Sequence, residues 1–310
     1  MSDNKFRLVT RSDFDGLVCA VLLKELKLID EIVFVHPKDM QDGKFAVSNR
    51  DITTNLPYVP GVHLSFDHHD SEVSRNQVPQ PNHIIEIGAA SAARVVFNHY
   101  GGKKAFPKVS DELMRAVDKA DSADYEPEEI LHPSSWTLLN YLMDSRTGLG
   151  RFKEFRISNY ELMMSLIGYC TQYSVEEILA LPDVKERVEL YREHEKRARE
   201  QIQRCSTVHQ NLVVYDTRQE ETLWAVNRFM IYALFPKTNI SLHALWGPQK
   251  AKTVFAVGKS IIDRSSQTHV GNLMLSYGGG GHQAAGTCQV DNDQAEQVLA
   301  ELITKITQDG

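Results

Sequence analysis

The chain lacks an excess of basic residues. Lys and Arg number 34 against 41 Asp and Glu, so the formal net charge is −7 over 310 residues. An acidic chain is poorly suited to hold long duplex nucleic acid by neutralising its phosphates. Metal ions or a local basic pocket can still attract a small anionic substrate. The charge balance therefore argues against long duplex DNA as a partner.

Long apolar runs and paired cysteines are also missing. The longest apolar run, residues 17–23, is far too short to span a bilayer, and no apolar segment follows the basic residues at the N-terminus, as it would in a secretory signal. Cys19, Cys170, Cys205 and Cys288 are widely scattered, which fits free thiols in a reducing compartment. We therefore expect a cytoplasmic protein without a membrane partner.

The first part of the sequence alternates between strand-like and helix-like segments. At roughly 150 residues per domain, the length predicts two domains. The alternation predicts a mainly parallel sheet covered by helices, with ligands bound beyond the carboxyl ends of its strands. The expected strands are residues 5–10, 32–36, 62–66 and 84–87, and the expected helices are residues 17–28 and 89–100.

The remainder reads as a helical stretch followed by a second mixed segment. Residues 110–205 are predicted to be helical, and residues 184–204 carry an apolar stripe with opposite charges at i, i+4, typical of a solvated connecting helix. Strands are expected at residues 212–215, 240–246, 253–257 and 287–290, and helices at residues 223–235, 270–277 and 291–307. We predict an α/β fold with a parallel-sheet domain (1–182), a helical linker (183–208) and a smaller α/β domain (209–310).

Two carboxylates follow the first strand directly. Asp13 and Asp15 are one residue apart, and Gly16 allows a tight turn. Carboxylates this close repel each other unless cations neutralise them, which suits a pair of divalent ions. A solvated turn with a helix N-cap explains the same residues equally well.

A second group, Asp67-His68-His69, ends another predicted strand and shifts that balance. Imidazole beside carboxylate suits Mn²⁺, Zn²⁺ or Fe²⁺ better than Ca²⁺. One His can bind a metal while its neighbour meets a substrate oxygen, and the Asp can fix a tautomer. Two such groups at one edge of a predicted sheet indicate a metal site. Further candidate carboxylates are Asp51, Asp118, Asp121 and Asp124.

A third group lies in the second half. The run from Gly278 to Gly281 precedes His282 and sits between a predicted helix and a predicted strand. Consecutive glycines let backbone N–H groups approach an anionic or planar ligand closely. Arg264 and Ser265, just upstream, could clamp a phosphate. A flexible linker has similar composition but no reason to end in His and small residues.

The motifs SDFDG, FDHHD and GGGGHQAAG occur in this order. Together they resemble the DHH phosphoesterase superfamily with its C-terminal DHH-associated domain. That superfamily includes RecJ-type exonucleases, nano-RNA phosphodiesterases and cyclic-dinucleotide phosphodiesterases, and some members are labelled exopolyphosphatase-related. The resemblance covers nearly the whole chain and is much more specific for the superfamily than for the substrate.

The resemblance implies a two-manganese site, with Mg²⁺ as the alternative metal. Asp13 would hold the first ion and Asp15 the second, with Asp51 bridging them. The implied metal ligands are Asp13, Asp15, Asp51, His68 and Asp121, with Asp118 in reserve for the last. His69 would face the scissile phosphate with Asp67 behind it, as the catalytic pair. The implied substrate-binding residues are Arg264, Ser265, Gly279, Gly280, Gly281 and His282.

The chain departs from the family pattern beside the first metal. Many members place a metal-binding His where this chain has Val9, and RecJ-like members place an Asp where it has Arg11. The first ion is therefore expected to bind more weakly than the second.

The resemblance predicts a hydrolase that cleaves phosphodiester bonds by a two-metal mechanism. We expect substrates to be linear dinucleotides, nano-RNA or cyclic dinucleotides. The sequence does not fix the oligomeric state, and a homodimer is compatible with it. The alternatives are a phosphatase acting on adenosine 3′,5′-bisphosphate or polyphosphate, and a catalytically weak nucleotide-binding sensor. Manganese-dependent turnover would separate the sensor from the enzymes.

Overall fold

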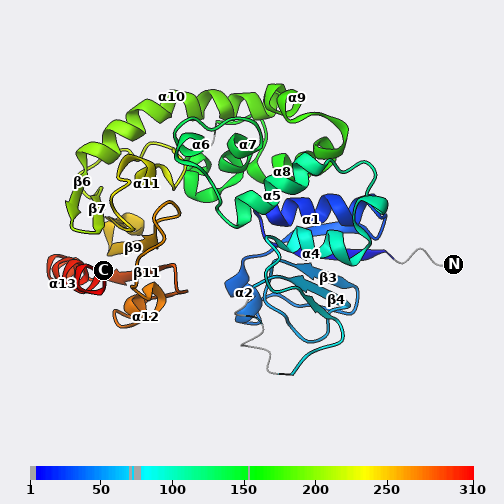
Figure 1. Cartoon of the computed structure of the whole chain (residues 1–310), viewed down its shortest axis with the longest axis horizontal. Helices are drawn as coiled ribbons and strands as arrows, with labels where there is room; N and C mark the ends of the chain where they lie inside the picture. Colours follow the sequence, from blue (N-terminus) through cyan, green and yellow to red (C-terminus); the bar gives the residue numbers. More distant parts are fainter. Residues whose placement is uncertain (1–4, 70–71, 73–77, 153) are drawn as a thin grey trace. The chain divides into compact units, whose positions relative to one another are not determined.

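The computed structural model describes residues 5–69, 72, 78–152 and 154–310, which form two compact units (Figure 1). Unit 1 consists of Met1–Asp124, Ser134–Ser145 and Gly150–Val188. Unit 2 consists of Tyr125–Pro133, Arg146–Leu149 and Glu189–Gly310. The division of the sequence after residues 182 and 208 stays a prediction.

Unit 1 contains a five-stranded sheet in which every pair of neighbours is parallel, with strand order β2-β1-β3-β4-β5. Its strands are β1 (Phe6–Thr10), β2 (Ile29–Phe34), β3 (Asp51–Thr54), β4 (Leu64–Asp67) and β5 (His83–Ile85). The predicted parallel sheet is confirmed. Strand β3 was missed because only one of its four buried residues, Ile52, is apolar.

Helices cover the sheet of unit 1, and α1 lies between β1 and the helices α4, α5 and α8. Every residue of α1 from Phe14 to Leu23 is buried, which explains why its apolar residues lie on all sides. The helices are α1 (Phe14–Glu25), α2 (Pro37–Gln41), α4 (Ala92–His99), α5 (Asp111–Asp121), α7 (Ser135–Met143), α8 (Asn159–Gln172) and α9 (Val175–Ala180). Short 3₁₀ turns are η1 (Gly102–Lys104), η2 (Ser145–Thr147) and η3 (Leu149–Arg151).

The long helix α10 (Pro182–Arg204) matches the helix expected at residues 184–204, and it contributes residues to both units. Its buried side chains include Val184, Tyr191, Ala198 and Ile202, so the apolar stripe is the packed face. No helix among the described residues has the length and hydropathy that crossing a membrane requires.

Unit 2 contains a six-stranded mixed sheet with strand order β10-β11-β9-β8-β7-β6, in which only the β7–β8 pair is parallel. The strands are β6 (Ser206–His209), β7 (Leu212–Asp216), β8 (Ile240–Trp246), β9 (Thr253–Lys259), β10 (Gly280–Gly281) and β11 (Ala285–Val290). The helices are α6 (Pro127–Leu131), α11 (Met230–Leu234), α12 (Val270–Leu275) and α13 (Ala295–Asp309), with the turn η4 (Pro248–Lys250).

Two helix predictions in unit 2 were too long. The helix expected at residues 223–235 is only α11, because side chains bind the preceding backbone in an irregular path: His194 accepts from Ala225 N, and Asn227 accepts from Phe229 N. The closing helix begins at Ala295 rather than 291. Asn292 does not cap it, because its side chain bonds to Thr253 and to the Lys250 carbonyl.

Candidate metal centre

The candidate site lies at the carboxyl ends of β1, β3 and β4, where the loop after β1 turns into α1. Asp13 is the N-cap of α1 and accepts a hydrogen bond from Gly16 N at 3.0 Å. A Cβ at Gly16 would lie 2.0 Å from the Arg11 carbonyl oxygen. Only glycine therefore fits a turn this tight, which brings both Asp13 and Asp15 to the sheet edge.

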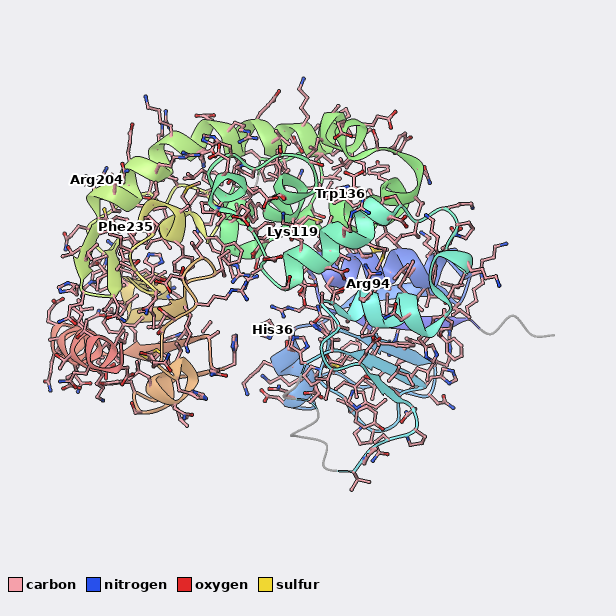
Figure 2. All side chains as sticks on the ribbon, in the orientation of Figure 1. His36, Arg94, Lys119, Trp136, Arg204 and Phe235 are labelled. Carbon is pink, nitrogen blue, oxygen red and sulfur yellow. The ribbon has the colours of Figure 1, made fainter. Side chains whose placement is uncertain are left out.

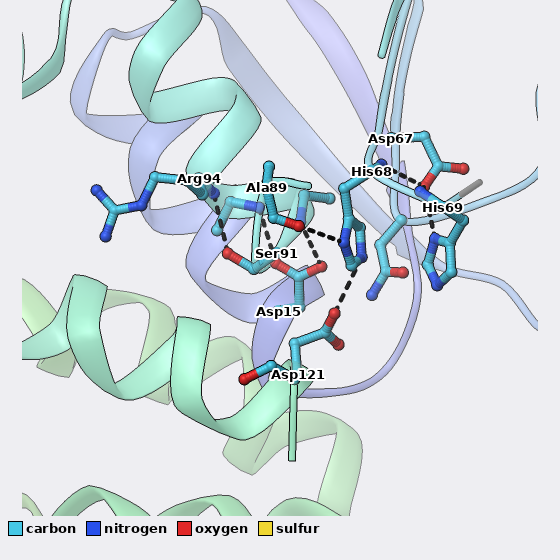
Figure 3. Close-up of polar contacts among 12 residues, drawn as sticks. Asp15, Asp67, His68, His69, Ala89, Ser91, Arg94 and Asp121 are labelled. Atoms are coloured by element: carbon cyan, nitrogen blue, oxygen red, sulfur yellow. Dashed lines mark hydrogen bonds and ion pairs between the residues drawn. The ribbon is translucent and has the colours of Figure 1, made fainter. Parts of the chain in front are cut away.

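Asp15 is buried and bound by backbone amides (Figure 3). Its Oδ2 accepts from Ala92 N at 3.0 Å, and its Oδ1 accepts from Ala93 N at 2.8 Å. These amides begin helix α4, whose N-terminus favours negative charge. Burial, with the nearby charges of Asp121 and Asp13, raises the pKa of Asp15 well above its ordinary value. A nearby cation would relieve that cost.

His68 turns one ring nitrogen toward a backbone carbonyl and the other toward a carboxylate (Figure 3). Nδ1 lies 3.1 Å from the Ala89 oxygen, which can only accept, so Nδ1 carries a proton. Nε2 lies 2.9 Å from Asp121 Oδ2 but makes no well-directed hydrogen bond, although it is buried. If the ring is neutral, the lone pair on His68 Nε2 faces a lone pair on Asp121 Oδ2.

A proton or a metal ion must stand between Nε2 and Asp121. Burial lowers the pKa of His68, but the Asp121 carboxylate outweighs this effect and raises it to about 9. Asp15, His68 and Asp121 offer ligand atoms that all lie within 4.8 Å of one another. Two carboxylates and one imidazole whose tautomer is set by a carbonyl form a donor set that fits a divalent transition metal.

The structure brings Asp121, rather than Asp118, to His68. Asp118 accepts from Ser91 Oγ at 2.8 Å and from Arg94 Nε at 3.0 Å. Arg94, labelled on α4 in Figure 2, thus ties that helix to α5 through an ion pair. Asp118 holds the two helices together, and this contact sets Asp121, at the end of α5, against His68.

Asp67 and His69 form a hydrogen-bonded pair beside this centre. Asp67 Oδ1 accepts from the backbone N of His68 at 2.7 Å and from the backbone N of His69 at 3.1 Å. His69 Nδ1 lies 2.6 Å from the same oxygen, so Nδ1 donates and Nε2 is the other ring nitrogen. The side chain of His69 is 44% exposed, whereas that of Asp67 is buried. The sequence expectation is that Asp67 supports the site from behind; the structure places its carboxylate on His69, and the catalytic role of the pair stays a prediction.

Asp13 has different neighbours from Asp15. Arg11 Nε lies 2.9 Å from Asp13 Oδ2, and Asn55 Nδ2 lies 3.2 Å from Oδ1. Asp13 can only accept, so Asn55 must turn its amide N–H groups toward it. The Asn55 oxygen is then buried without a hydrogen bond among the described residues.

Asp51 does not reach the site, contrary to the expectation that it bridges two ions. It begins β3 and pairs in register with Arg7, near the start of β1, whereas the site lies at the strand ends. Four residues of strand correspond to about 13 Å. Asp51 accepts from Arg7 Nε at 2.7 Å and from Ser48 N at 2.6 Å. Its carboxylate is buried in an ion pair with Arg7 at the amino ends of the strands, whereas the site lies at their carboxyl ends.

In unit 2, the glycine run forms an edge hairpin. Gly278 has a φ of +73°, and a Cβ at Gly279 would lie 2.1 Å from the Thr287 oxygen. A Cβ at Gly281 would lie 2.3 Å from the Ala285 oxygen, whereas Gly280 faces open space. Backbone packing thus requires three of the four glycines, independently of any ligand.

The other expected substrate-binding residues of unit 2 are near the surface. Arg264 is exposed, and its Nε donates to the Ile261 oxygen at 3.1 Å. Ser265 Oγ accepts from Asn239 Nδ2 at 3.0 Å. The exposed His282 accepts from Ala284 N through Nδ1 at 3.3 Å. Their role in binding stays a prediction.

Sequence reasoning missed Asn55 entirely and did not foresee the contact between Arg11 and Asp13. Asn55 directly follows β3, so an Asn at a strand end was the available signal. That signal was hidden because β3 itself was not predicted, and because a carboxylate was expected in that part of the site.

Comparison with solved structures places this geometry among known proteins. The pGpG-specific phosphodiesterase PggH from Vibrio cholerae is 62% identical in sequence to this chain. The two structures superpose with a TM-score of 0.89, and the alignment covers 99% of this chain and 100% of PggH. The chain matches no family model, and no curated protein matches it.

Two more distant structures share the fold. RecJ from Thermus thermophilus, in complex with Mn²⁺, is 13% identical with a TM-score of 0.53, covering 98% of this chain and 52% of that chain. CDC45 from Entamoeba histolytica is 8% identical with a TM-score of 0.52, covering 98% of this chain and 96% of that chain.

Proposed function

The chain belongs to the DHH phosphoesterase superfamily, and from this premise we propose that it is a metal-dependent phosphodiesterase that hydrolyses the linear dinucleotide pGpG. The observation that carries the proposal is the half-buried pair of His68 Nε2 and Asp121 Oδ2, 2.9 Å apart, because a divalent cation can take the place of the proton between these two atoms. The similarity to a pGpG-specific phosphodiesterase supports the choice of substrate.

We propose Mn²⁺ as the metal, with Mg²⁺ as the alternative. Asp15, His68 and Asp121 would hold it, and the mixture of imidazole and carboxylate favours Mn²⁺ over Mg²⁺. When bound, a divalent ion stabilises negative charge on phosphate oxygens and lowers the pKa of water. The chain itself provides the orientation: α4 amides hold Asp15, the Ala89 carbonyl holds His68, and the Arg94–Asp118 pair holds α5.

His69 is the residue of this site that we propose to contact the scissile phosphate. Asp67 accepts the proton on Nδ1, so the ring is oriented with Nε2 as the atom for the substrate. A carboxylate behind the ring also stabilises a positive charge on it, which suits a group that binds a phosphate oxygen. Asp67 therefore acts through His69 as a positioning residue.

Hydrolysis of pGpG consumes one water and yields two molecules of GMP. The bond between phosphorus and the 3′ oxygen breaks; one nucleotide keeps the new 5′ phosphate, and the other regains its 3′ hydroxyl. We propose that the hairpin residues Gly279, Gly280, Gly281 and His282, with Arg264 and Ser265, bind the remainder of the dinucleotide. Exposed backbone amides in such a hairpin can approach an anionic group closely.

The decisive experiment is turnover of pGpG by the purified chain with and without Mn²⁺, followed by chromatography of nucleotides. We expect GMP as the product, and loss of activity with a chelator that Mn²⁺ restores. The same assay should include cyclic di-GMP, short RNA, adenosine 3′,5′-bisphosphate and polyphosphate. If the chain preferred to release inorganic phosphate from adenosine 3′,5′-bisphosphate or from polyphosphate, it would be a phosphatase instead of a phosphodiesterase. Binding of pGpG without turnover would favour a sensor.

A further inference from the structure

Three hydrogen-bond donors face the Asp13 carboxylate. Its oxygens face Arg11 Nε at 2.9 Å, Gly16 N at 3.0 Å and Asn55 Nδ2 at 3.2 Å. A metal ion binds to electron-pair donors, and each N–H already directed at Asp13 competes with an ion for the same lone pairs. Asp15, two residues away, also accepts two backbone N–H groups, but it faces the imidazole of His68 and the carboxylate of Asp121 as well.

The positions around Asp13 offer few ligands for an ion. Val9 lies where many relatives have a metal-binding histidine, and here it is fully buried in an apolar cluster with Met40 and Leu56. At the end of β3 the chain has Asn55, which carries no charge. Asp51, the expected bridging carboxylate, is paired with Arg7 at the other edge of the sheet.

Charge leads to the same conclusion. The guanidinium of Arg11 is a fixed positive charge whose Nε lies 2.9 Å from Asp13 Oδ2, and a fixed positive charge beside this carboxylate disfavours a second cation there.

We propose that this chain binds a single divalent ion, in the Asp15–His68–Asp121 group, and that Arg11, held by its ion pair with Asp13, supplies the positive charge that another metal ion would otherwise bring. The inference rests on the proposed metal-dependent function. The side chain of Arg11 is 39% exposed, so its remaining N–H groups can meet a phosphate oxygen while Nε stays on Asp13. Guanidinium is always charged and donates in a fixed plane, which suits this task.

The test counts metal ions by calorimetric titration with Mn²⁺ and by electron paramagnetic resonance of the bound ion, with and without GMP. We expect one ion per chain in the wild type under both conditions, with the spectrum of an isolated Mn²⁺. The double variant Arg11→Ala, Asn55→Asp removes the cation and places two carboxylates together. We expect it to bind two ions, with a spectrum showing coupling between them.

Single variants supply a second readout. Arg11→Ala should lower kcat by roughly 10²-fold, while Arg11→Lys should recover part of this loss because it keeps a positive charge. Arg50→Ala, at an exposed arginine directly before β3, is the matched control and should behave as wild type.

Two ions in the wild type, with or without GMP, would overturn the inference and leave the proposed function intact. A double variant that folds and still binds one ion would also contradict it. No bound ion in the wild type, with pGpG turnover unchanged by a chelator, would instead refute the metal-dependent function on which the inference rests.

Discussion

Asp13 and Asp15 are separated by one residue, yet the structure gives them opposite surroundings. Asp15 is buried against His68 and Asp121, where electron-pair donors converge. Asp13 is partly exposed and faces Arg11 and Asn55, where hydrogen-bond donors converge. The same type of side chain therefore belongs to a group that we propose to bind a metal in one place, and it anchors a guanidinium in the other. The residues that neighbouring strands and helices place beside each carboxylate determine its role.

The largest expected effect separates the group of Asp15, His68 and Asp121 from Asp13. Asp121→Asn removes a charge from the Asp15 group and should abolish tight Mn²⁺ binding and lower kcat/KM on the order of 10³-fold. Asp13→Asn should leave Mn²⁺ affinity within about threefold, since Asn also caps a helix well. Calorimetry and pGpG turnover measure both. Asp124→Asn, on an exposed residue just after α5, is the control. Equal loss of Mn²⁺ in the Asp13 and Asp121 variants would show that our distinction is wrong.

The second prediction extends the comparison to the two neighbouring histidines. His68→Ala should lose both the metal and activity, whereas His69→Ala should keep the metal and lose about 10²-fold in kcat. His69 is paired with Asp67 and reaches solvent, while His68 is buried among ligands. Metal content after desalting, together with turnover, distinguishes the two. If His69→Ala also lost its Mn²⁺, the ring would be a ligand instead of a contact to phosphate.

The third prediction concerns Asp51, another carboxylate paired with an arginine. Asp51→Asn should keep Mn²⁺ binding but destabilise the fold by about 1–3 kcal/mol at pH 7, because Arg7 and Ser48 lose a charged acceptor. Asp42→Asn, on an exposed ion pair with Lys38, should leave the stability nearly unchanged, because solvent screens such a pair. Urea unfolding measures both.

The effect of Asp51 should also depend on pH. Burial alone would raise its pKa, but hydrogen bonds from Arg7 and Ser48 outweigh this and hold the pKa below its ordinary value. The folded pKa is lower than the unfolded one, so the contribution is complete above about pH 4 and is lost as pH falls through the folded pKa. The stability gap between wild type and Asp51→Asn should therefore shrink in acid. If the stability difference between wild type and Asp51→Asn did not change with pH, the ion pair between Asp51 and Arg7 would not be its cause.

The smallest expected effect compares two adjacent glycines. Gly279→Ala should destabilise the hairpin, because a Cβ there meets the Thr287 oxygen. Gly280→Ala meets nothing and should leave the melting temperature unchanged. If the hairpin contacts the substrate, Gly280→Ala should raise KM for pGpG several-fold. An unchanged KM would reduce the glycine run to a purely structural feature.

Much of the site could be read from the sequence, and the errors have physical causes. The motifs around Asp15 and His68 indicated a metal, and the choice of Asp121 over Asp118 agrees with the geometry. Asp51 was misplaced because a carboxylate near a strand can lie at either end, and only the register with Arg7 shows which. The helix predicted at residues 223–235 was too long partly because the Ala225 backbone N–H binds His194 of α10, a contact that the local sequence does not reveal.

The sequence by itself determined the parallel α/β architecture of unit 1, the motifs that identify the superfamily, and the residues able to bind a metal, because these depend on local periodicity and on residue type. Tertiary structure alone decided which carboxylate meets which partner. Strand register carried Asp51 away from the site, the end of β3 brought Asn55 to Asp13, and α5 set Asp121 against His68. Coulombic and hydrogen-bonding energies act over a few ångströms, so the chemistry of each carboxylate depends on neighbours that are distant in the sequence.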